Sequence, residues 1–318
     1  MLMRLMLRPA AVVARSYRRS LVGTRNLVSS PATDSSLASS IADRVAAAVT
    51  PELIAAFRKD GAVCIRGLFS STELDTLKRG IDDNLASPSP RSKVASRPED
   101  PGWFFEDFCN WQDNAAYRGF IAQSPAPSAA AALMGSNQVR LYHDHLLIKE
   151  PGTVQRTLFH QDLPYYNIEG KQNVSFWIPI DPVPLEQTLE FVAGSHLGPW
   201  FMPRSFMDKQ AKWFPEGSLA DLPDIDSNRD AFPIRRWAME PGDFVCFHML
   251  TLHAANGAKT RRRAFSVRFM GDDMRHAPRP WKTSPDFPGL VDELAAGAEM
   301  DHPLFPVVWS QEHGQTWA

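Results

Sequence analysis

Hydrophobic and polar positions divide the chain into an N-terminal part with helical periodicity and a longer part with strand-like runs. Thr50-Pro51-Glu52 predicts the start of a helix, because threonine is a good cap and proline is favoured at the first helical position. An apolar stripe of Leu53, Ile54 and Phe57 follows, and Gly61 ends it. Ser70-x-x-Glu73 has the pattern of a capping box and predicts a second helix.

Further along the chain, short apolar or alternating runs are separated by turn signals such as Pro151-Gly152, Gly194-Ser195 and Pro241-Gly242. The predicted strands are 62–65, 138–149, 153–159, 173–180, 189–192, 232–237, 244–248 and 263–269. Segment 87–101, rich in Ser, Pro and Arg, predicts a loop. Many short strands without regular helical alternation predict a mainly β protein with flanking helices, either a sandwich or a jelly roll.

The first 36 residues differ from the rest. Six arginines precede the first acidic residue, Asp34, and serines cluster between positions 29 and 40. This pattern is typical of an organellar transit peptide, and the alternative is a disordered tail. We therefore expect one folded domain at 37–318, with a mitochondrial location in a eukaryote and a cytoplasmic one otherwise. Without residues 1–36 the chain has 34 − 6 = 28 basic and 36 − 1 = 35 acidic residues, a net charge of −7.

Composition narrows the class of protein. With 318 residues, 44% of them hydrophobic, the chain can bury a full core. The near balance of 34 basic and 36 acidic residues does not indicate nucleic-acid binding. Cys64, Cys109 and Cys246 lack the spacing of a disulfide framework or a structural zinc site. No apolar run reaches the roughly 18 residues needed to span a bilayer.

A first chemical signal is Phe159-His160-Gln161-Asp162, at the end of a predicted strand. Strand side chains alternate with period two, so His160 and Asp162 are expected on one face. One imidazole and one carboxylate are two ligands of the facial triad that binds ferrous iron. The pair alone is common by chance, so a third ligand must come from elsewhere.

A second signal lies downstream, where the segment 241–253 predicts a turn, a strand and then His253 near the end of that strand. Arg262 follows nine residues later, and alternation places Arg262, Ala264, Ser266 and Arg268 on one face. A guanidinium there can bind a carboxylate through two hydrogen bonds. The alternative is a solvated basic turn with a packed histidine.

Together these segments resemble the phytanoyl-CoA dioxygenase family of Fe(II)/2-oxoglutarate oxygenases. The resemblance extends from about residue 60 to about residue 273, and it is carried by segments 60–67, 149–152, 159–166, 189–196 and 241–268. It implies a double-stranded β-helix (jelly roll), with iron(II), 2-oxoglutarate and dioxygen as cofactors and co-substrates. His160, Asp162 and His253 correspond to the catalytic metal ligands.

The resemblance also places Arg262 at the distal carboxylate of 2-oxoglutarate, Trp177 in the co-substrate pocket, and His145 and Thr157 as weaker contacts. The segment before the arginine cluster is shorter than is usual for the family, so Arg261 and Arg263 remain alternatives. Ala255 stands where family members often have a serine. Of the other histidines, we interpret His143 as part of a pocket wall or as a residue that supports the metal ligands from behind, His196 as a turn element and His248 as core.

The expected reaction is hydroxylation of a small or medium organic metabolite, with release of succinate and CO2. Asp162 supports this expectation, because related halogenases have a small residue in place of the carboxylate. Segment 202–230 is expected to be a lid over the site, and it has no strong basic cluster for a CoA phosphate. The alternative is a non-catalytic or isomerase-like metal-binding jelly roll. The oligomeric state is left open.

Overall fold

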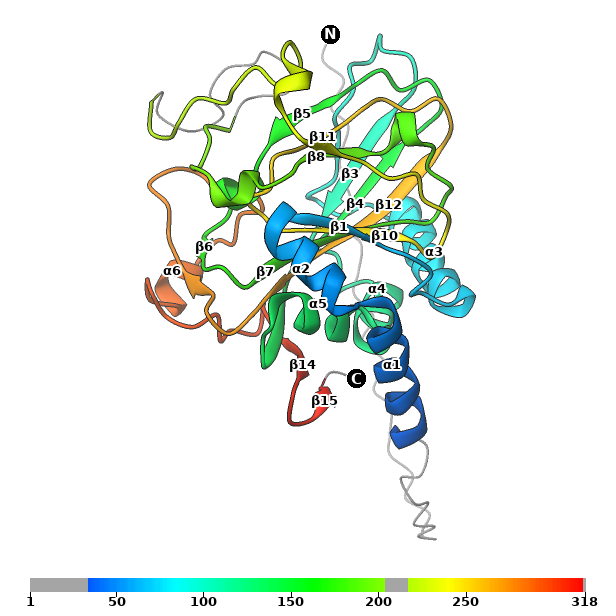
Figure 1. The fold of residues 1–318 in the computed structure, drawn as a ribbon, viewed down its shortest axis with the longest axis vertical. Helices are drawn as coiled ribbons and strands as arrows, with labels where there is room; N and C mark the ends of the chain where they lie inside the picture. Colours follow the sequence, from blue (N-terminus) through cyan, green and yellow to red (C-terminus); the bar gives the residue numbers. More distant parts are fainter. Residues whose placement is uncertain (1–33, 204–216, 317–318) are drawn as a thin grey trace, which may run out of the picture.

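The computed structural model describes residues 34–203 and 217–316, which form two facing antiparallel β-sheets with helices on the outer face of the larger one (Figure 1). This is the mainly β jelly roll with flanking helices that the sequence predicts. Hydrophobic side chains from both sheets meet between them, including Trp177, Phe191 and Phe247.

Within the described residues, the larger sheet has nine strands in the order β1-β10-β7-β12-β4-β14-β15, with β3 paired to β4 and β2 to β3. The strands are β1 (Ala62–Ile65), β2 (Lys93–Val94), β3 (Phe104–Phe108), β4 (Gln138–Lys149), β7 (Asn173–Pro179), β10 (Phe244–Phe247), β12 (Arg262–Met270), β14 (Val307–Ser310) and β15 (Gly314–Gln315). The long strand β12 lies between β4 and β7, so its side chains project from the middle of the sheet.

The smaller sheet has the order β5-β11-β8-β9. Its strands are β5 (Thr157–His160), β8 (Leu189–Val192), β9 (Ile234–Arg235) and β11 (His253–Ala255). A separate pair joins β6 (Ile168–Glu169) to β13 (Arg275–His276). The strands of the smaller sheet are short, and consecutive partners in it are far apart in the sequence.

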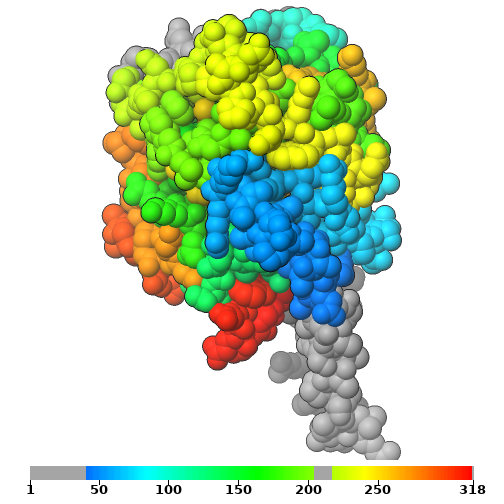
Figure 2. Space-filling view, viewed as in Figure 1, coloured from blue at the N-terminus to red at the C-terminus, as the bar shows by residue number. Residues whose placement is uncertain are grey.

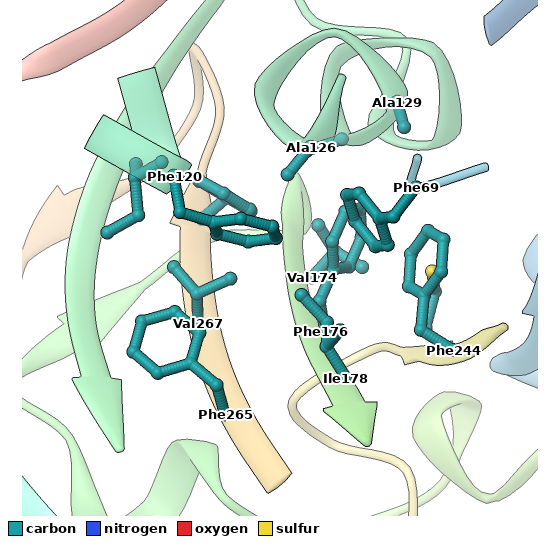
Figure 3. Close-up of a cluster of buried hydrophobic side chains, with 14 of the residues drawn as sticks. Phe69, Phe120, Ala126, Ala129, Val174, Phe176, Ile178, Phe244, Phe265 and Val267 are labelled. Atoms are coloured by element: carbon teal, nitrogen blue, oxygen red, sulfur yellow. The ribbon is translucent and has the colours of Figure 1, made fainter. Parts of the chain in front are cut away.

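Helices cover the outer face of the larger sheet and enclose its main core (Figure 3). They are α1 (Asp34–Ala48), α2 (Pro51–Asp60), α3 (Ser71–Ala86), α4 (Ala115–Gln123) and α5 (Ala126–Met134), and a short α6 (Leu290–Glu293) lies elsewhere. Phe244 packs at 4.7 Å from Phe69 and 4.9 Å from Phe176, measured between ring centroids. Burial of each such ring contributes about 1.5–3 kcal/mol, so this core holds the larger sheet rigid behind the site.

The predicted helix ends are confirmed. Thr50 caps α2 by accepting a hydrogen bond from the Leu53 amide at 3.3 Å, and Gly61 ends that helix with a left-handed φ of 76°. Ser70 and Glu73 form the expected capping box of α3, in which the Ser70 amide donates to Glu73 at 2.7 Å.

Several strand boundaries were wrong. Of the run 153–159 only Thr157 to Phe159 are in a strand, which continues to His160; the run 232–237 shortens to Ile234–Arg235, and the predicted loop 87–101 contains β2. The sequence also missed β3, α4 and α5. Helix α5 is alanine-rich and mostly buried, so it lacks the polar face that would have indicated a helix.

Figure 2 shows the N-terminal helical segment (blue) packed beneath the yellow segment near residue 235, and an ion pair of 3.2 Å joins Asp60 to Arg235. Residues 1–33 of the expected transit segment and residues 204–216 of the expected lid lie outside the described residues. Among the described helices, none has the length and hydropathy required to cross a membrane.

Candidate active site

His160 and His253 form a pair across two neighbouring strands. His160 is the last residue of β5 and His253 is the first residue of β11, and the antiparallel register places them directly opposite each other. Residues opposed in this way project from the same face of a sheet, and the two ring centroids are 4.2 Å apart. The sequence prediction placed His253 near the end of the preceding strand. That was wrong, because β10 ends at Phe247 and a turn separates it from His253.

Asp162 reaches the two histidines from a turn and not from a strand. Its backbone is helical (φ −77°, ψ −44°) and leads into a short 3-10 turn at Leu163–Tyr165. The amides of Asp162 and Leu163 both donate to the Met249 carbonyl, at 2.8 and 3.0 Å. The proximity of His160 and Asp162 was therefore predicted correctly, but period-two alternation was the wrong reason for it.

The three side chains converge on one point, with one potential ligand atom of each within 4.8 Å of the others. Asp162 Oδ1 lies 3.5 Å from His160 Nε2 and 3.7 Å from His253 Nε2. The Nδ1 atoms lie 2.8 Å and 2.9 Å from the carbonyls of Leu158 and Thr251. A proton on each Nδ1 places a lone pair on each Nε2, on the side of Asp162, so the donor set fits a divalent metal ion.

The second oxygen of the carboxylate is bound elsewhere. Asp162 Oδ2 accepts hydrogen bonds from Arg268 Nη2 at 3.2 Å and from Ser175 Oγ at 3.4 Å. Burial alone would raise the pKa of Asp162, but the Arg268 charge and the two histidines hold that pKa well below its usual value. Burial and the neighbouring His160 lower the pKa of His253 to about 3, so His253 is neutral, as a metal ligand must be.

A cavity of about 370 Å³ opens on this cluster and lies between the two sheets. All seven residues that the sequence predicted for the site line it: His145, Thr157, His160, Asp162, Trp177, His253 and Arg262. His145 stacks on Phe108 with 3.9 Å between ring centroids, and its Nε2 is 3.4 Å from Glu106. Burial lowers the pKa of His145 to about 4, so it forms a neutral part of the wall.

Of the three candidate arginines, Arg262 is the one that lines the cavity. It is buried, donates to the carbonyls of Gln187 and Asn256, and lies 5.6 Å from the centroid of the Trp177 ring. Arg261 pairs with Glu150 at 2.9 Å on the surface, and Arg263 pairs with Asp181 at 2.7 Å on the other face of β12. Strand alternation therefore predicted the register of β12 correctly.

Arg262 has no carboxylate within ion-pair distance among the described residues, and burial lowers its pKa to about 10. It is still charged at neutral pH. A buried cation without a counter-charge is costly, so this end of the cavity suits the carboxylate of a ligand. The charge and the donor geometry fit the distal carboxylate of 2-oxoglutarate.

Lys149 is a second buried basic residue at this end of the cavity, and the sequence did not identify it as part of the site. Its Nζ donates to the carbonyls of Gln155 at 2.7 Å and Asn256 at 3.0 Å, so it shares the Asn256 oxygen with Arg262. Burial, and then the charge of Arg262, lower its pKa to about 6. The signal available in the sequence was its position at the end of the predicted strand 138–149, in a segment (149–152) that carries the family resemblance.

The remaining histidines lie outside the metal cluster, as expected. His248 bonds to Asn173 and to the Lys171 carbonyl, and His196 lies 3.2 Å from the Arg58 carbonyl. His143 is buried beside Tyr166 and does not line the cavity, so of its two interpretations the pocket wall was wrong and a supporting place behind the metal ligands remains. It lies opposite Arg268 on β4, behind the site.

A jelly roll with two histidines and one carboxylate converging in a cavity between its sheets defines the class of non-haem iron oxygenases. The sequence matches the phytanoyl-CoA dioxygenase (PhyH) family over residues 57–265, more than half of the chain, and the protein belongs to this family. It is a 2-oxoglutarate-dependent dioxygenase, with iron and 2-oxoglutarate as its cofactors. A search among curated proteins gave no match.

Solved structures share the fold. The α-ketoglutarate-dependent carbocyclase SnoK from nogalamycin biosynthesis is 24% identical over 81% of this chain and 96% of its own, with a TM-score of 0.63. The epimerase SnoN from the same biosynthesis is 22% identical (80% and 97% covered, TM-score 0.62). EctD from S. alaskensis, solved with 2-oxoglutarate and 5-hydroxyectoine, is 17% identical (80% and 88% covered, TM-score 0.59).

Proposed function

We propose that the protein hydroxylates a small or medium organic metabolite, with 2-oxoglutarate as co-substrate and with succinate and CO2 as co-products. The observation that carries the proposal is that one cavity contains both the His-Asp-His cluster and the uncompensated Arg262. A volume of about 370 Å³ is at the lower end of ligand pockets, which are roughly 300–1,000 Å³. It suits a co-substrate and part of a modest substrate.

The residues of the chain have separate tasks in this reaction. Ferrous iron with 2-oxoglutarate and dioxygen supplies the oxidation of a C–H bond. His160, Asp162 and His253 hold the metal, and Arg262 binds the distal carboxylate of the co-substrate beside the Trp177 ring. The Lys149 amine lies close to Arg262 and shares the Asn256 carbonyl with it, so it can take up a proton when a carboxylate binds there. Phe108, His145 and Tyr165 line the wall and exclude water.

Hydroxylation is favoured over halogenation because the carboxylate of Asp162 fills a ligand position and is fixed by Arg268. SnoK is a carbocyclase and SnoN is an epimerase, so cyclisation and epimerisation are the alternative outcomes on this fold. They are distinguished by the product, since only hydroxylation adds an oxygen atom to the substrate.

Anaerobic titration of the ferrous protein with 2-oxoglutarate tests the co-substrate part of the proposal. We expect a weak visible charge-transfer band from the chelate, and succinate formation once dioxygen and a substrate are added. Candidate metabolites can then be screened by their stimulation of succinate release, with oxygen incorporation followed by mass spectrometry. Absence of the band would favour a non-catalytic metal-binding protein.

The substrate is proposed to be a metabolite without a CoA group, since segment 202–230 has no strong basic cluster. We also propose that this segment covers the site. In its described part, Asp226 pairs at 3.1 Å with Arg156, which lines the cavity. This ion pair links the segment to the site.

For localisation, we propose that residues 1–36 form a mitochondrial targeting segment if the protein is eukaryotic. The support is the set of six arginines before the first acidic residue. Fusion of residues 1–36 to a fluorescent reporter should direct the reporter to mitochondria. A matched fusion with the six arginines changed to glutamine should stay cytosolic, and a diffuse signal from the unaltered fusion would contradict the proposal.

A further inference from the structure

The two oxygens of Asp162 lie in different surroundings. Oδ1 is turned to the Nε2 atoms of His160 and His253 on the smaller sheet. Oδ2 is turned to the larger sheet, where it accepts hydrogen bonds from Arg268 at 3.2 Å and Ser175 at 3.4 Å. Arg268 and Ser175 are direct partners in the register of β12 and β7, so one rigid strand pair supplies both donors.

The Arg268 guanidinium contacts two side chains of the site, Asp162 and Tyr166. Its side chain is buried, its Nε donates to the Tyr166 hydroxyl at 3.1 Å, and Asp162 is its one ion-pair partner within the described part of the chain. A buried ion pair is on average no more stabilising than a well-packed apolar pair. Its presence against a metal-binding carboxylate therefore points to a role in the site and not in general stability.

The chemical consequence concerns how many oxygens the carboxylate can give to a metal. A carboxylate binds through one oxygen or through both, and binding through both would take a position that a chelating co-substrate needs. With Oδ2 held by two donors, Oδ1 remains as the single ligand atom. We propose that Arg268, assisted by Ser175, is a positioning residue that restricts Asp162 to one-oxygen coordination and so keeps three metal positions open.

The inference rests on the proposed function for the use of those open positions, but it can be tested with a metal alone. Co(II) is the probe, because the intensity of its visible absorption decreases as its coordination number increases. We compare the wild-type protein with Arg268→Met, Arg268→Lys and Ser175→Ala. The matched control is Arg263→Met, which removes a paired arginine from the outer face of the same strand.

We expect Arg268→Met to bind Co(II) and Fe(II) roughly 10- to 100-fold more weakly, as is usual when a group that orients a metal ligand is lost. Its Co(II) spectrum should shift toward a higher coordination number at the carboxylate. Arg268→Lys should recover part of the affinity, Ser175→Ala should show a smaller change in the same direction, and Arg263→Met should resemble the wild type.

Wild-type affinity and spectrum in a folded Arg268→Met protein would overturn the inference. If Arg268→Met does not fold, wild-type spectra in both Arg268→Lys and Ser175→Ala would overturn it instead. The proposed function fails separately, through a missing 2-oxoglutarate band in the wild-type protein, and that result would leave the Co(II) comparison unaffected.

Discussion

Two buried arginines at opposite ends of β12, on the same face of the strand, have opposite electrostatic environments. Arg268 faces a carboxylate of the protein, Asp162, at 3.2 Å. Arg262 faces carbonyl oxygens and the Trp177 ring, with no carboxylate within ion-pair distance in the described part of the chain. One charge is therefore neutralised by folding, and the other is left for a ligand to neutralise.

The difference shows how this strand separates positioning from binding. An uncompensated buried charge lowers the stability of the empty protein, whereas Lys149 beside Arg262 avoids that cost because its lowered pKa of about 6 leaves the amine neutral. A ligand carboxylate that binds beside Arg262 forms the ion pair that no carboxylate of the described residues forms with it. The paired end of the strand instead fixes the metal ligand before any co-substrate binds.

The largest expected effect concerns the three metal ligands. The comparison of Arg268 with Arg262 depends on them, because Arg268 acts on a bound metal only through Asp162. His160→Ala, Asp162→Ala and His253→Ala should each abolish iron retention or turnover, because each removes one of three ligands. His196→Ala should keep both, since His196 lies outside the cluster. Iron content and succinate formation provide the measurements. Normal succinate production by iron-loaded Asp162→Ala would contradict the assignment of the three ligands.

The next effect is on stability, and it compares the paired Arg268 with the unpaired Arg262 directly in the metal-free protein. Arg268→Leu should lower the free energy of unfolding by about 3–5 kcal/mol, because it leaves Asp162 buried without its partner. Arg262→Leu should leave that free energy nearly unchanged or raise it, because no protein carboxylate loses a partner. Urea unfolding monitored by fluorescence measures both. Equal destabilisation by the two substitutions would remove the distinction.

For 2-oxoglutarate affinity the order of the two arginines should be reversed, with the larger effect at Arg262. Arg262→Leu should raise the apparent dissociation constant for 2-oxoglutarate by roughly 30- to 1,000-fold or more, equivalent to about 2–5 kcal/mol, and disturb iron binding little. Arg261→Leu, on the exposed face and paired with Glu150, is the control and should be mild. A mild effect of Arg262→Leu together with a severe one of Arg263→Leu would mean that the co-substrate approaches from the other face.

A smaller effect is a pH dependence from Lys149. In the free protein its pKa is about 6, lowered from 10.5 by burial and by the charge of Arg262, so the amine is neutral at pH 8. A bound carboxylate favours the charged form and raises this pKa, so binding takes up a proton. Affinity should then fall by up to about tenfold per pH unit as pH rises from 6 to the raised pKa.

Calorimetry of 2-oxoglutarate binding at pH 8, in two buffers of different ionisation enthalpy, measures the proton uptake. Lys149→Met should abolish the uptake and flatten the pH dependence, while Arg261→Leu should retain both. Binding by the wild-type protein without proton uptake would show that Lys149 stays neutral when 2-oxoglutarate binds.

Local chemistry made much of the molecule predictable from its sequence. The caps at Thr50 and Ser70 depend on neighbouring residues alone, and both are confirmed. Strands β4 and β8 match their predicted bounds, and alternation along β12 correctly assigned Arg262 and Arg263 to opposite faces. The metal ligands were identified through the order and spacing of motifs that resemble a family.

The remaining features depend on contacts between distant segments. The turn that carries Asp162 is held by the Met249 carbonyl, and the opposition of His160 and His253 is a matter of sheet register. Neither is encoded by a local pattern. Lys149 would be solvated on most strands, and only the folded structure shows that it is buried beside Arg262.

The register of His160 against His253 has a consequence for the dynamics of the protein. More than ninety residues separate the two histidines, yet their strands, β5 and β11, are only 4 and 3 residues long. A metal ion held by both is a crosslink that closes this long loop, so metal binding and strand pairing stabilise each other. We therefore expect the backbone amides of β5 and β11 to exchange their hydrogens faster in the metal-free protein than in the metal-bound protein. Loss of iron and local opening of the smaller sheet should then occur as one event.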